Sequence, residues 1–174
     1  MTTARIAPWL VVLGFLAAVL ATWRDYGVSW DESLQTRLGE MTIEYWSGQL
    51  DAEKLAEVRD LRYYGPVVET LWAVLHRAFG GPRYETHHLV SALSGVLAVA
   101  GVARFAALFS AAPLAPAFAT LALLLLPPFY GHAFINSKDI PFACGVVWSM
   151  FLIARLIWGP DNRQLLPLSI LLGA

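Results

Sequence analysis

The sequence predicts an all-α protein: a bundle of transmembrane helices with amphipathic helices in the first non-cytoplasmic loop. Of the 174 residues, 57% are hydrophobic and only 14% are charged, whereas roughly a quarter of the residues of a soluble domain are charged. In addition, 18 of the 25 charged residues lie between Arg24 and Glu85. The flanking stretches are therefore almost uncharged, and a stretch of about 20 apolar residues is long enough to cross the roughly 30 Å core of a bilayer.

These apolar stretches define the expected membrane spans, and each contains at most one charged residue. They cover residues 7–23, 87–109, 115–130 and 140–158, and a fifth, 165–174, is cut off by the chain end. A span cut off in this way suggests that residues 1–174 are the N-terminal part of one larger membrane domain. The first stretch also has features of a cleavable signal peptide, but its length and the later spans favour a retained helix.

Charge and cysteine content exclude two other classes of protein. The net charge is −1 and no basic stripe is present, which argues against a nucleic-acid partner. Cys144 is the only cysteine, so the chain has no disulfide framework of its own.

The positions of the basic residues predict the orientation of the spans. Arg5, Arg104, Arg155 and Arg163 all fall at span ends that would share one side of the membrane. Basic residues in short loops favour the cytoplasmic side. The long segment 24–86 and the short segment 131–139 would then both face the opposite, non-cytoplasmic side. Lys138 is an exception to the pattern, because it is a basic residue in a short outer loop.

The outer segment 24–86 begins with a predicted helix. Ser29 and Glu32 have the spacing of a capping box, in which each residue satisfies a backbone amide of the other. Apolar residues then recur at helical spacing as far as Gly48.

Two more amphipathic helices are expected before the second span. Asp51 is placed to cap one of them, and Pro66 suits the first turn of the other. The second of these, residues 67–79, is too short to cross a bilayer comfortably, so we expect it to lie on the membrane surface. If it did cross, every later span would reverse and the acidic residues described next would be separated.

An acidic pair, Asp31 and Glu32, follows the first span after a short polar lead. Both carboxylates would also be favourable simply as N-terminal residues of a helix, where the helix dipole stabilises negative charge. Their position favours a functional role, because they lie on the same predicted side as a second polar segment.

That second polar segment, residues 131–139, interrupts the apolar half of the chain. It contains His132, Asn136, Lys138 and Asp139 between two predicted spans. Asp139 could be simply the cap of the following helix, but ionisable groups at the edge of a membrane domain are functional candidates. His87 and His88 open the second span, 87–109, on the same side, close behind Arg83, and this basic group suggests an anion site.

Taken in order, these motifs resemble the membrane glycosyltransferases of the GT-C fold, and family 39 above all, which includes protein O-mannosyltransferases and aminoarabinose transferases. The resemblance covers the chain as the N-terminal portion of such an enzyme. It rests on Ser29-Trp30-Asp31-Glu32-Ser33, Tyr64-Gly65-Pro66, residues 80–95 and Asn136-Ser137-Lys138-Asp139-Ile140-Pro141. Two positions depart from the pattern: many relatives have His-Pro-Pro at residues 64–66, and many have arginine where His88 stands.

The resemblance implies a transferase that moves a sugar from a polyprenyl-phosphate donor to a lipid, glycan or protein acceptor. Its site would lie on the non-cytoplasmic side of a bacterial inner membrane. Asp31 would be the general base, with Glu32 and Asp139 as further catalytic residues. The expected substrate-binding residues are Lys138, His88, Arg83, His132, Asn136 and Tyr64. No cofactor is expected; the wider fold allows a metal ion bridging Asp31 and Asp139, but none is predicted here.

The alternative functions are a polytopic membrane transporter and a non-enzymatic membrane scaffold. A transporter is expected to place polar groups or broken helices near the middle of the bilayer. Here the polar residues cluster at one predicted membrane face, and the middle of each span is Leu, Val, Ala or Phe. The sequence therefore favours the enzyme.

Overall fold

A computed structural model describes residues 2–57 and 65–158, and all regular secondary structure in this part of the chain is α-helical. The helices are α1 (Thr2–Thr22), α2 (Glu32–Trp46), α3 (Ala52–Ala56), α4 (Val67–Phe79), α5 (Arg83–Phe109), α6 (Ala115–Leu124), α7 (Pro127–Ile135) and α8 (Asp139–Trp158). Tyr64 and the expected fifth span, 165–174, lie outside the described residues.

Three helices, α1, α5 and α8, are long and apolar enough to cross a membrane. They correspond to three of the predicted spans, although α1 and α5 each begin about a turn earlier than the sequence indicated. The coarse prediction of a helical membrane protein therefore agrees with the structure.

The predicted span 115–130 is wrong as a single helix. Its first part is α6, which ends at Leu124, and the chain then turns by 66° into α7. Pro127 and Pro128 explain the break, because proline has no amide hydrogen to donate and its ring disfavours helical geometry at the preceding residue. Leu126 accordingly has an extended conformation, with φ −75° and ψ 112°.

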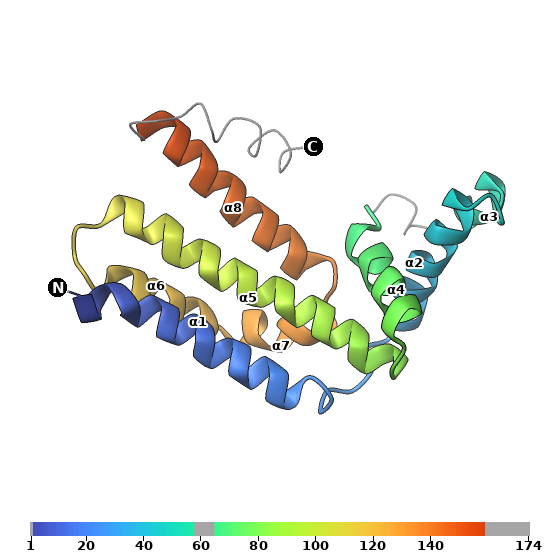
Figure 1. Cartoon of the computed structure of the whole chain (residues 1–174), viewed down its shortest axis with the longest axis horizontal. Coiled ribbons are helices and arrows are strands. Elements are labelled where there is room, and N and C mark those ends of the chain that lie inside the picture. Colours follow the sequence, from blue (N-terminus) through green and yellow to red (C-terminus); the bar gives the residue numbers. More distant parts are fainter. Residues whose placement is uncertain (1, 58–64, 159–174) are drawn as a thin grey trace.

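Helix α5 is the centre of the bundle, with α1, α6, α7 and α8 packed around it (Figure 1). Small residues on α5 allow this close packing. A Cβ atom added at Gly101 would lie 2.8 Å from Val147 Cγ1 of α8, and one at Gly95 would lie 3.3 Å from Ala133 Cβ of α7. Lipid tails are as apolar as the helices themselves, so the hydrophobic effect does not drive helices together in a membrane. Close backbone packing of this kind is then a main source of helix association. Trp148 Nε1 adds a 3.0 Å hydrogen bond to the Leu97 carbonyl.

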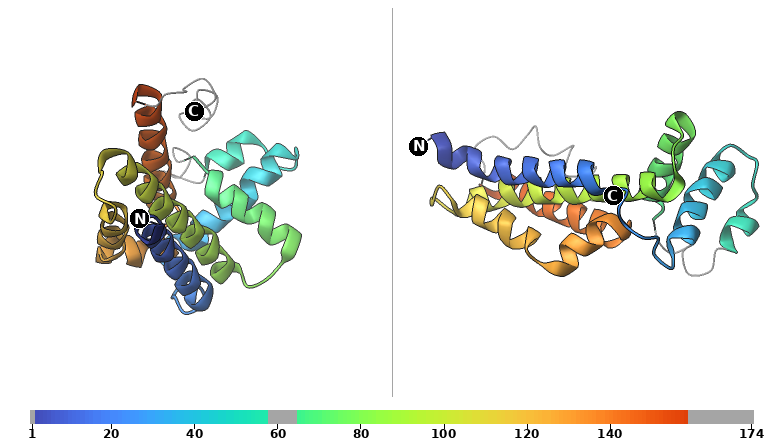
Figure 2. Two further views of the ribbon diagram at one scale, coloured as in Figure 1. Left: turned by 60° about the vertical axis from the view of Figure 1, so that its left-hand side comes forward. Right: turned by 90° about the horizontal axis from the view of Figure 1, so that it is seen from below.

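Helices α2, α3 and α4 form a separate layer beyond one end of the long helices (Figure 2, right). Helix α2 packs along α4, and Gly39 lies so close to the Glu69 carbonyl that a Cβ atom there would overlap it. Helix α4 has the predicted length and buries Trp72, while Val67, Leu71 and Phe79 stay exposed. Such an exposed apolar side is typical of a helix lying at a membrane surface.

The two ends of the bundle differ in character. The α1 N-terminus and the C-terminal ends of α5 and α8 lie at one end, so Arg5, Arg104 and Arg155 gather there (Figure 1). The other end carries α2 to α4, the loop after α1 and the junction between α7 and α8. Both polar segments of the sequence therefore reach the same end of the molecule.

Candidate functional site

A cleft of about 430 Å³ opens where the two polar segments meet. Its walls come from the loop after α1, from α2, and from the region where α7 passes into α8. The lining residues are Ser29, Trp30, Asp31, Gln35, His132, Ile135, Asn136, Lys138 and Asp139. The structure thus brings Asp31 together with five residues that lie about a hundred positions later.

Aromatic stacking holds the two walls side by side. Tyr26, in the loop after α1, stacks on Phe134 of α7 with ring centroids 3.8 Å apart. Phe134 is fully buried and also contacts Tyr130 on its own helix. Because Tyr26 precedes Asp31 by only five residues, this stack fixes the loop against the C-terminal half of α7.

Asp31 is the most heavily contacted carboxylate in the cleft. Its Oδ2 atom accepts hydrogen bonds from Lys138 Nζ at 2.9 Å and from Gln35 Nε2 at 2.6 Å, and its Oδ1 atom accepts one from Ser29 Oγ at 3.2 Å. Partial burial raises the pKa of Asp31, but the bond and positive charge of Lys138 outweigh it, so the pKa lies below its ordinary value. Asp31 is therefore ionised at neutral pH, and Lys138 gains the partner that explains a basic residue in this loop.

Asn136 organises the opposite wall. Its Oδ1 atom accepts hydrogen bonds from the backbone amides of Lys138 and Asp139, at 3.2 and 2.9 Å, and so caps the start of α8. Its Nδ2 group donates to Asp139 Oδ2 at 2.8 Å and to His132 Nδ1 at 3.0 Å. Asn136 thus does the capping that Asp139 could have done, which leaves the Asp139 carboxylate exposed in the cleft.

The position of His132 follows from the same network. Because the Asn136 amide donates to His132 Nδ1, the ring accepts there and carries its proton on Nε2. His132 is exposed and lines the cleft, so this N–H is available to a bound ligand.

Glu32 does not line the cleft, in contrast to its neighbour Asp31. It is fully buried, its Oε2 atom accepts from the Ser29 amide at 2.9 Å, and its Oε1 atom accepts from His87 Nδ1 at 2.9 Å. His88 Nε2 lies 2.8 Å from the same Oε1 atom but is not aligned for a hydrogen bond.

The charge of Glu32 is stabilised by these contacts. Burial raises its pKa, but the two histidines and the Ser29 amide outweigh this and lower the pKa to about 2. Glu32 is thus an ionised link between α2 and α5. The capping box is only half formed, because the Ser29 hydroxyl bonds to Asp31 instead of a helix amide, and Asp31, which occupies the N-cap position of α2, makes no side-chain capping bond.

Ser137 connects the cleft to a second buried carboxyl group. Its hydroxyl lies 2.8 Å from Gln35 Oε1 and 2.9 Å from Glu69 Oε1. One hydroxyl hydrogen can serve only one of these acceptors. Burial raises the pKa of Glu69, and a protonated Glu69 can donate to Ser137 while Ser137 donates to Gln35. Gln35 in turn donates to Asp31, which completes a chain from Glu69 to the cleft.

The remaining predicted residues lie outside the cleft lining. Arg83 bonds to Glu40 at 3.1 Å and to Thr36 Oγ1 at 3.1 Å, and it lies over the Trp72 ring. His88 is fully buried against Glu32. The basic group expected to form an anion site is therefore divided, and among the described residues Lys138 and His132 are the basic side chains that line the cleft.

Three residues of the network were missed by sequence reasoning: Gln35, Glu69 and Ser137. Gln35 lies one helical turn after Asp31, a spacing that signals contact on a helix face. Glu69 and Ser137 give no such signal, because their contacts depend on how α4 is placed against the α7–α8 junction.

The chain matches no protein-family model, no curated protein and no solved structure. The likeness to family 39 glycosyltransferases therefore remains a prediction from the sequence motifs. Within the described residues, no group of three or more His, Cys, Asp or Glu side chains is arranged to hold a metal ion.

Proposed function

We propose that this chain is part of a membrane glycosyltransferase of the GT-C type. It would transfer a sugar from a polyprenyl-phosphate donor to an acceptor on the non-cytoplasmic face of a bacterial inner membrane. The observation that supports this best is the pairing of Asp31 with Lys138 in one cleft, 107 residues apart in sequence. A carboxylate and a cation side by side are what such a transfer requires.

In the proposed reaction Asp31 is the general base. Its carboxylate removes the proton of the acceptor hydroxyl as the acceptor oxygen bonds to the anomeric carbon of the sugar. The bond from that carbon to the phosphate oxygen breaks, and the polyprenyl phosphate leaves with the electron pair. A positioned base contributes typically about 10²–10⁴-fold to the rate.

Lys138 has the charge to stabilise the departing phosphate. As it turns from Asp31 to the phosphate, the pKa of Asp31 rises towards its ordinary value and the carboxylate becomes a stronger base. His132 can add an N–H donor beside it. Preorganised cations and donors of this kind often supply the largest part of transition-state stabilisation.

Asp139 and Trp30 are the remaining groups with a proposed role. Asp139 faces the same cleft and can accept a hydrogen bond from a sugar or acceptor hydroxyl. Trp30 is 94% exposed at the edge of the cleft. An exposed indole there offers a flat apolar surface against which a sugar ring or the donor lipid can pack.

The experiment is a transfer assay on the full-length protein in membranes, with a radiolabelled polyprenyl-phosphate sugar as donor. Asp31→Asn keeps the shape of the side chain but removes the base, so we expect transfer to fall at least about 100-fold. Asp25→Asn, an exposed carboxylate in the same loop, is the matched control and should retain full activity. Full transfer by Asp31→Asn in protein that expresses normally would remove Asp31 from the mechanism.

One observation favours transport as the alternative function. The bend between α6 and α7 is the kind of helix break that lines substrate sites in transporters. However, the residues at the break, Leu125 and Leu126, are apolar and exposed, and the polar side chains gather in the cleft instead. An uptake assay run beside the transfer assay separates the two functions.

A further inference from the structure

A second pocket, of about 470 Å³, lies at the opposite end of the bundle from the cleft. It is formed where the N-terminal part of α1 meets the C-terminal part of α5 and the turn into α6. The lining residues are Arg5, Pro8, Trp9, Ala103, Arg104, Ala107, Ser110, Ala111, Ala112, Pro113 and Pro116. None of them belongs to the network around Asp31.

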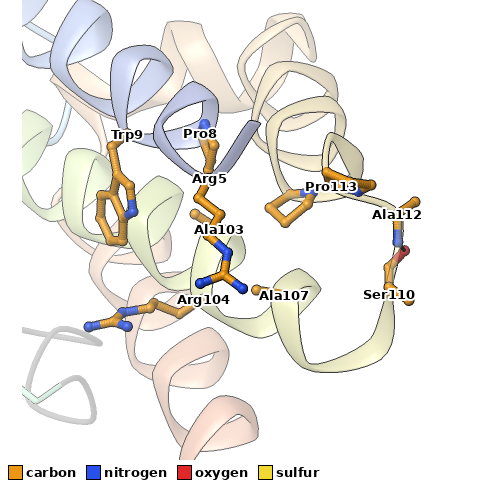
Figure 3. Close-up of a pocket in the computed structure, with 11 residues that line it drawn as sticks. Arg5, Pro8, Trp9, Ala103, Arg104, Ala107, Ser110, Ala112 and Pro113 are labelled. Atoms are coloured by element: carbon orange, nitrogen blue, oxygen red, sulfur yellow. Dashed lines mark hydrogen bonds between the residues drawn. The ribbon is translucent and has the colours of Figure 1, made fainter. Parts of the chain in front are cut away.

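The pocket has a strong positive charge for its size. Arg5 extends from α1 towards α5, and the Arg104 guanidinium lies 5.5 Å from the centre of the Trp9 ring (Figure 3). Among the described residues, no acidic side chain lines the pocket and neither arginine forms an ion pair. The negative end of the α5 dipole and the positive end of the α6 dipole adjoin here and offset each other, so the charge comes from the two arginines.

The other lining residues are mostly alanine, proline and the Trp9 indole, so the pocket combines two cations with apolar walls. It also lies at the ends of α1 and α5, two helices long and apolar enough to cross a membrane. That depth is where phospholipid headgroups and interfacial tryptophans meet. A soluble anion would gain nothing from the apolar walls.

We propose that this pocket binds the headgroup of an anionic phospholipid, with Arg5 and Arg104 contacting its phosphate. Guanidinium groups suit phosphate because their donors form a planar fork. A zwitterionic headgroup would place an ammonium group in a pocket whose described lining holds two arginines and no carboxylate, so lipids with a net negative charge are preferred. The inference is independent of the proposed enzymatic function, because it uses none of the residues in the cleft.

Native mass spectrometry of the purified full-length protein tests this proposal. The probes are phosphatidylglycerol, phosphatidylcholine of the same acyl chains, and inorganic phosphate. We expect retention of phosphatidylglycerol in preference to phosphatidylcholine. The double variant Arg5→Gln/Arg104→Gln should weaken phosphatidylglycerol retention about tenfold or more, since each basic residue near anionic lipid contributes about 1 kcal/mol, roughly fivefold.

Arg24→Gln is the matched control, because Arg24 lies 4.4 Å from the centre of the Trp23 ring at the other end of α1 and does not line the pocket. It should leave the lipid preference unchanged. Arg5→Lys/Arg104→Lys, which keeps the charge, should retain most of the preference and shows that loss in the glutamine variant is not misfolding. Equal retention of both lipids by the wild type, an unchanged preference in the glutamine variant, or displacement of the lipid by millimolar inorganic phosphate would overturn the proposal.

Discussion

Glu32 is a fully buried carboxylate whose negative charge the fold must keep paired. His87 and His88 approach one of its oxygens and the Ser29 amide bonds to the other. Removing one partner of a buried charged pair is costly because the remaining buried polar groups are left without an interaction partner. The pair of acidic residues in the sequence thus separates by role: Asp31 faces the cleft, and Glu32 joins α2 to α5.

Glu32→Gln should lower the free energy of unfolding by about 3–5 kcal/mol at pH 7. The folded-state pKa of about 2 lies below the ordinary value of 4.5, so the stabilisation from ionised Glu32 is present above pH 4.5 and is lost as the pH falls towards 2. Denaturant titration in detergent between pH 2 and pH 7 measures both effects. Glu40→Gln, at a half-exposed ion pair with Arg83, should cost less than about 1 kcal/mol. Equal stability of the two variants at pH 7 would contradict this role.

Glu69 has the opposite pH behaviour. Burial raises its pKa above 4.5, so the wild type loses stability as the pH rises from 4.5 through the raised folded-state value. Glu69→Gln keeps a hydrogen-bonding group towards Ser137 but cannot ionise, so its stability relative to the wild type should improve across that range. Thermal unfolding between pH 4 and pH 8 measures this difference. The exposed Glu53→Gln variant should follow the wild type, and a Glu69→Gln curve parallel to the wild type would count against a neutral buried Glu69.

The sequence predicted which residues line the cleft more accurately than it predicted which side chains are buried beside it. Asp31, His132, Asn136, Lys138 and Asp139 were predicted together because each lies in a polar segment bounded by apolar runs. The burial of Glu32 and His88 could not be predicted in the same way. It depends on the angle at which α2 crosses the start of α5, and the local sequence does not determine such a crossing.

At the scale of elements, the contact between α2 and α4 positions Glu69, which is linked through Ser137 and Gln35 to Asp31 in the cleft. Gly39 allows the two backbones to touch, and Glu69 is the residue it touches. Any side chain at residue 39 would push α4 away from α2. It would also shift Glu69 away from Ser137.

Gly39→Ala should therefore destabilise the protein by about 1–3 kcal/mol, the usual cost of overpacking, and should reduce transfer by disturbing the chain that ends at Asp31. Thermal unfolding and the transfer assay measure the two effects. Gly14→Ala is the matched control, because Gly14 is also in a helix but has open space around it; alanine there should be neutral or slightly stabilising. A Gly39→Ala variant as stable as Gly14→Ala would show that α2 and α4 do not pack as described.

The break between α6 and α7 shows where periodicity alone misleads. Residues 115–130 form one continuous apolar run, so hydropathy predicts one span. The two prolines at 127 and 128 override this, because a helix cannot run through them without losing backbone hydrogen bonds. Recognising that the helix ends there was possible from the sequence, but the 66° turn into α7 was not, because such an angle depends on how α7 packs against the rest of the bundle.

At the scale of the whole molecule, the two ends of the bundle have different chemistry. One end carries Arg5 and Arg104 around an apolar pocket, and the other carries the cleft with both polar segments. The positions of arginine in the sequence predicted this division. The long polar segment between α1 and α5 places α2 and α4 at the cleft end, so residues distant in sequence lie close together there.

The most direct test of this account is cross-linking between the two walls of the cleft in intact membranes. Cysteines replace Trp30 and His132 in a Cys144→Ser background, and a short, membrane-impermeant bis-maleimide is added from the non-cytoplasmic side. Because both residues line the same cleft, the account predicts that the two cysteines become linked and that polyprenyl-phosphate donor slows the reaction. Labelling of residues 30 and 132 from opposite sides of the membrane would contradict it.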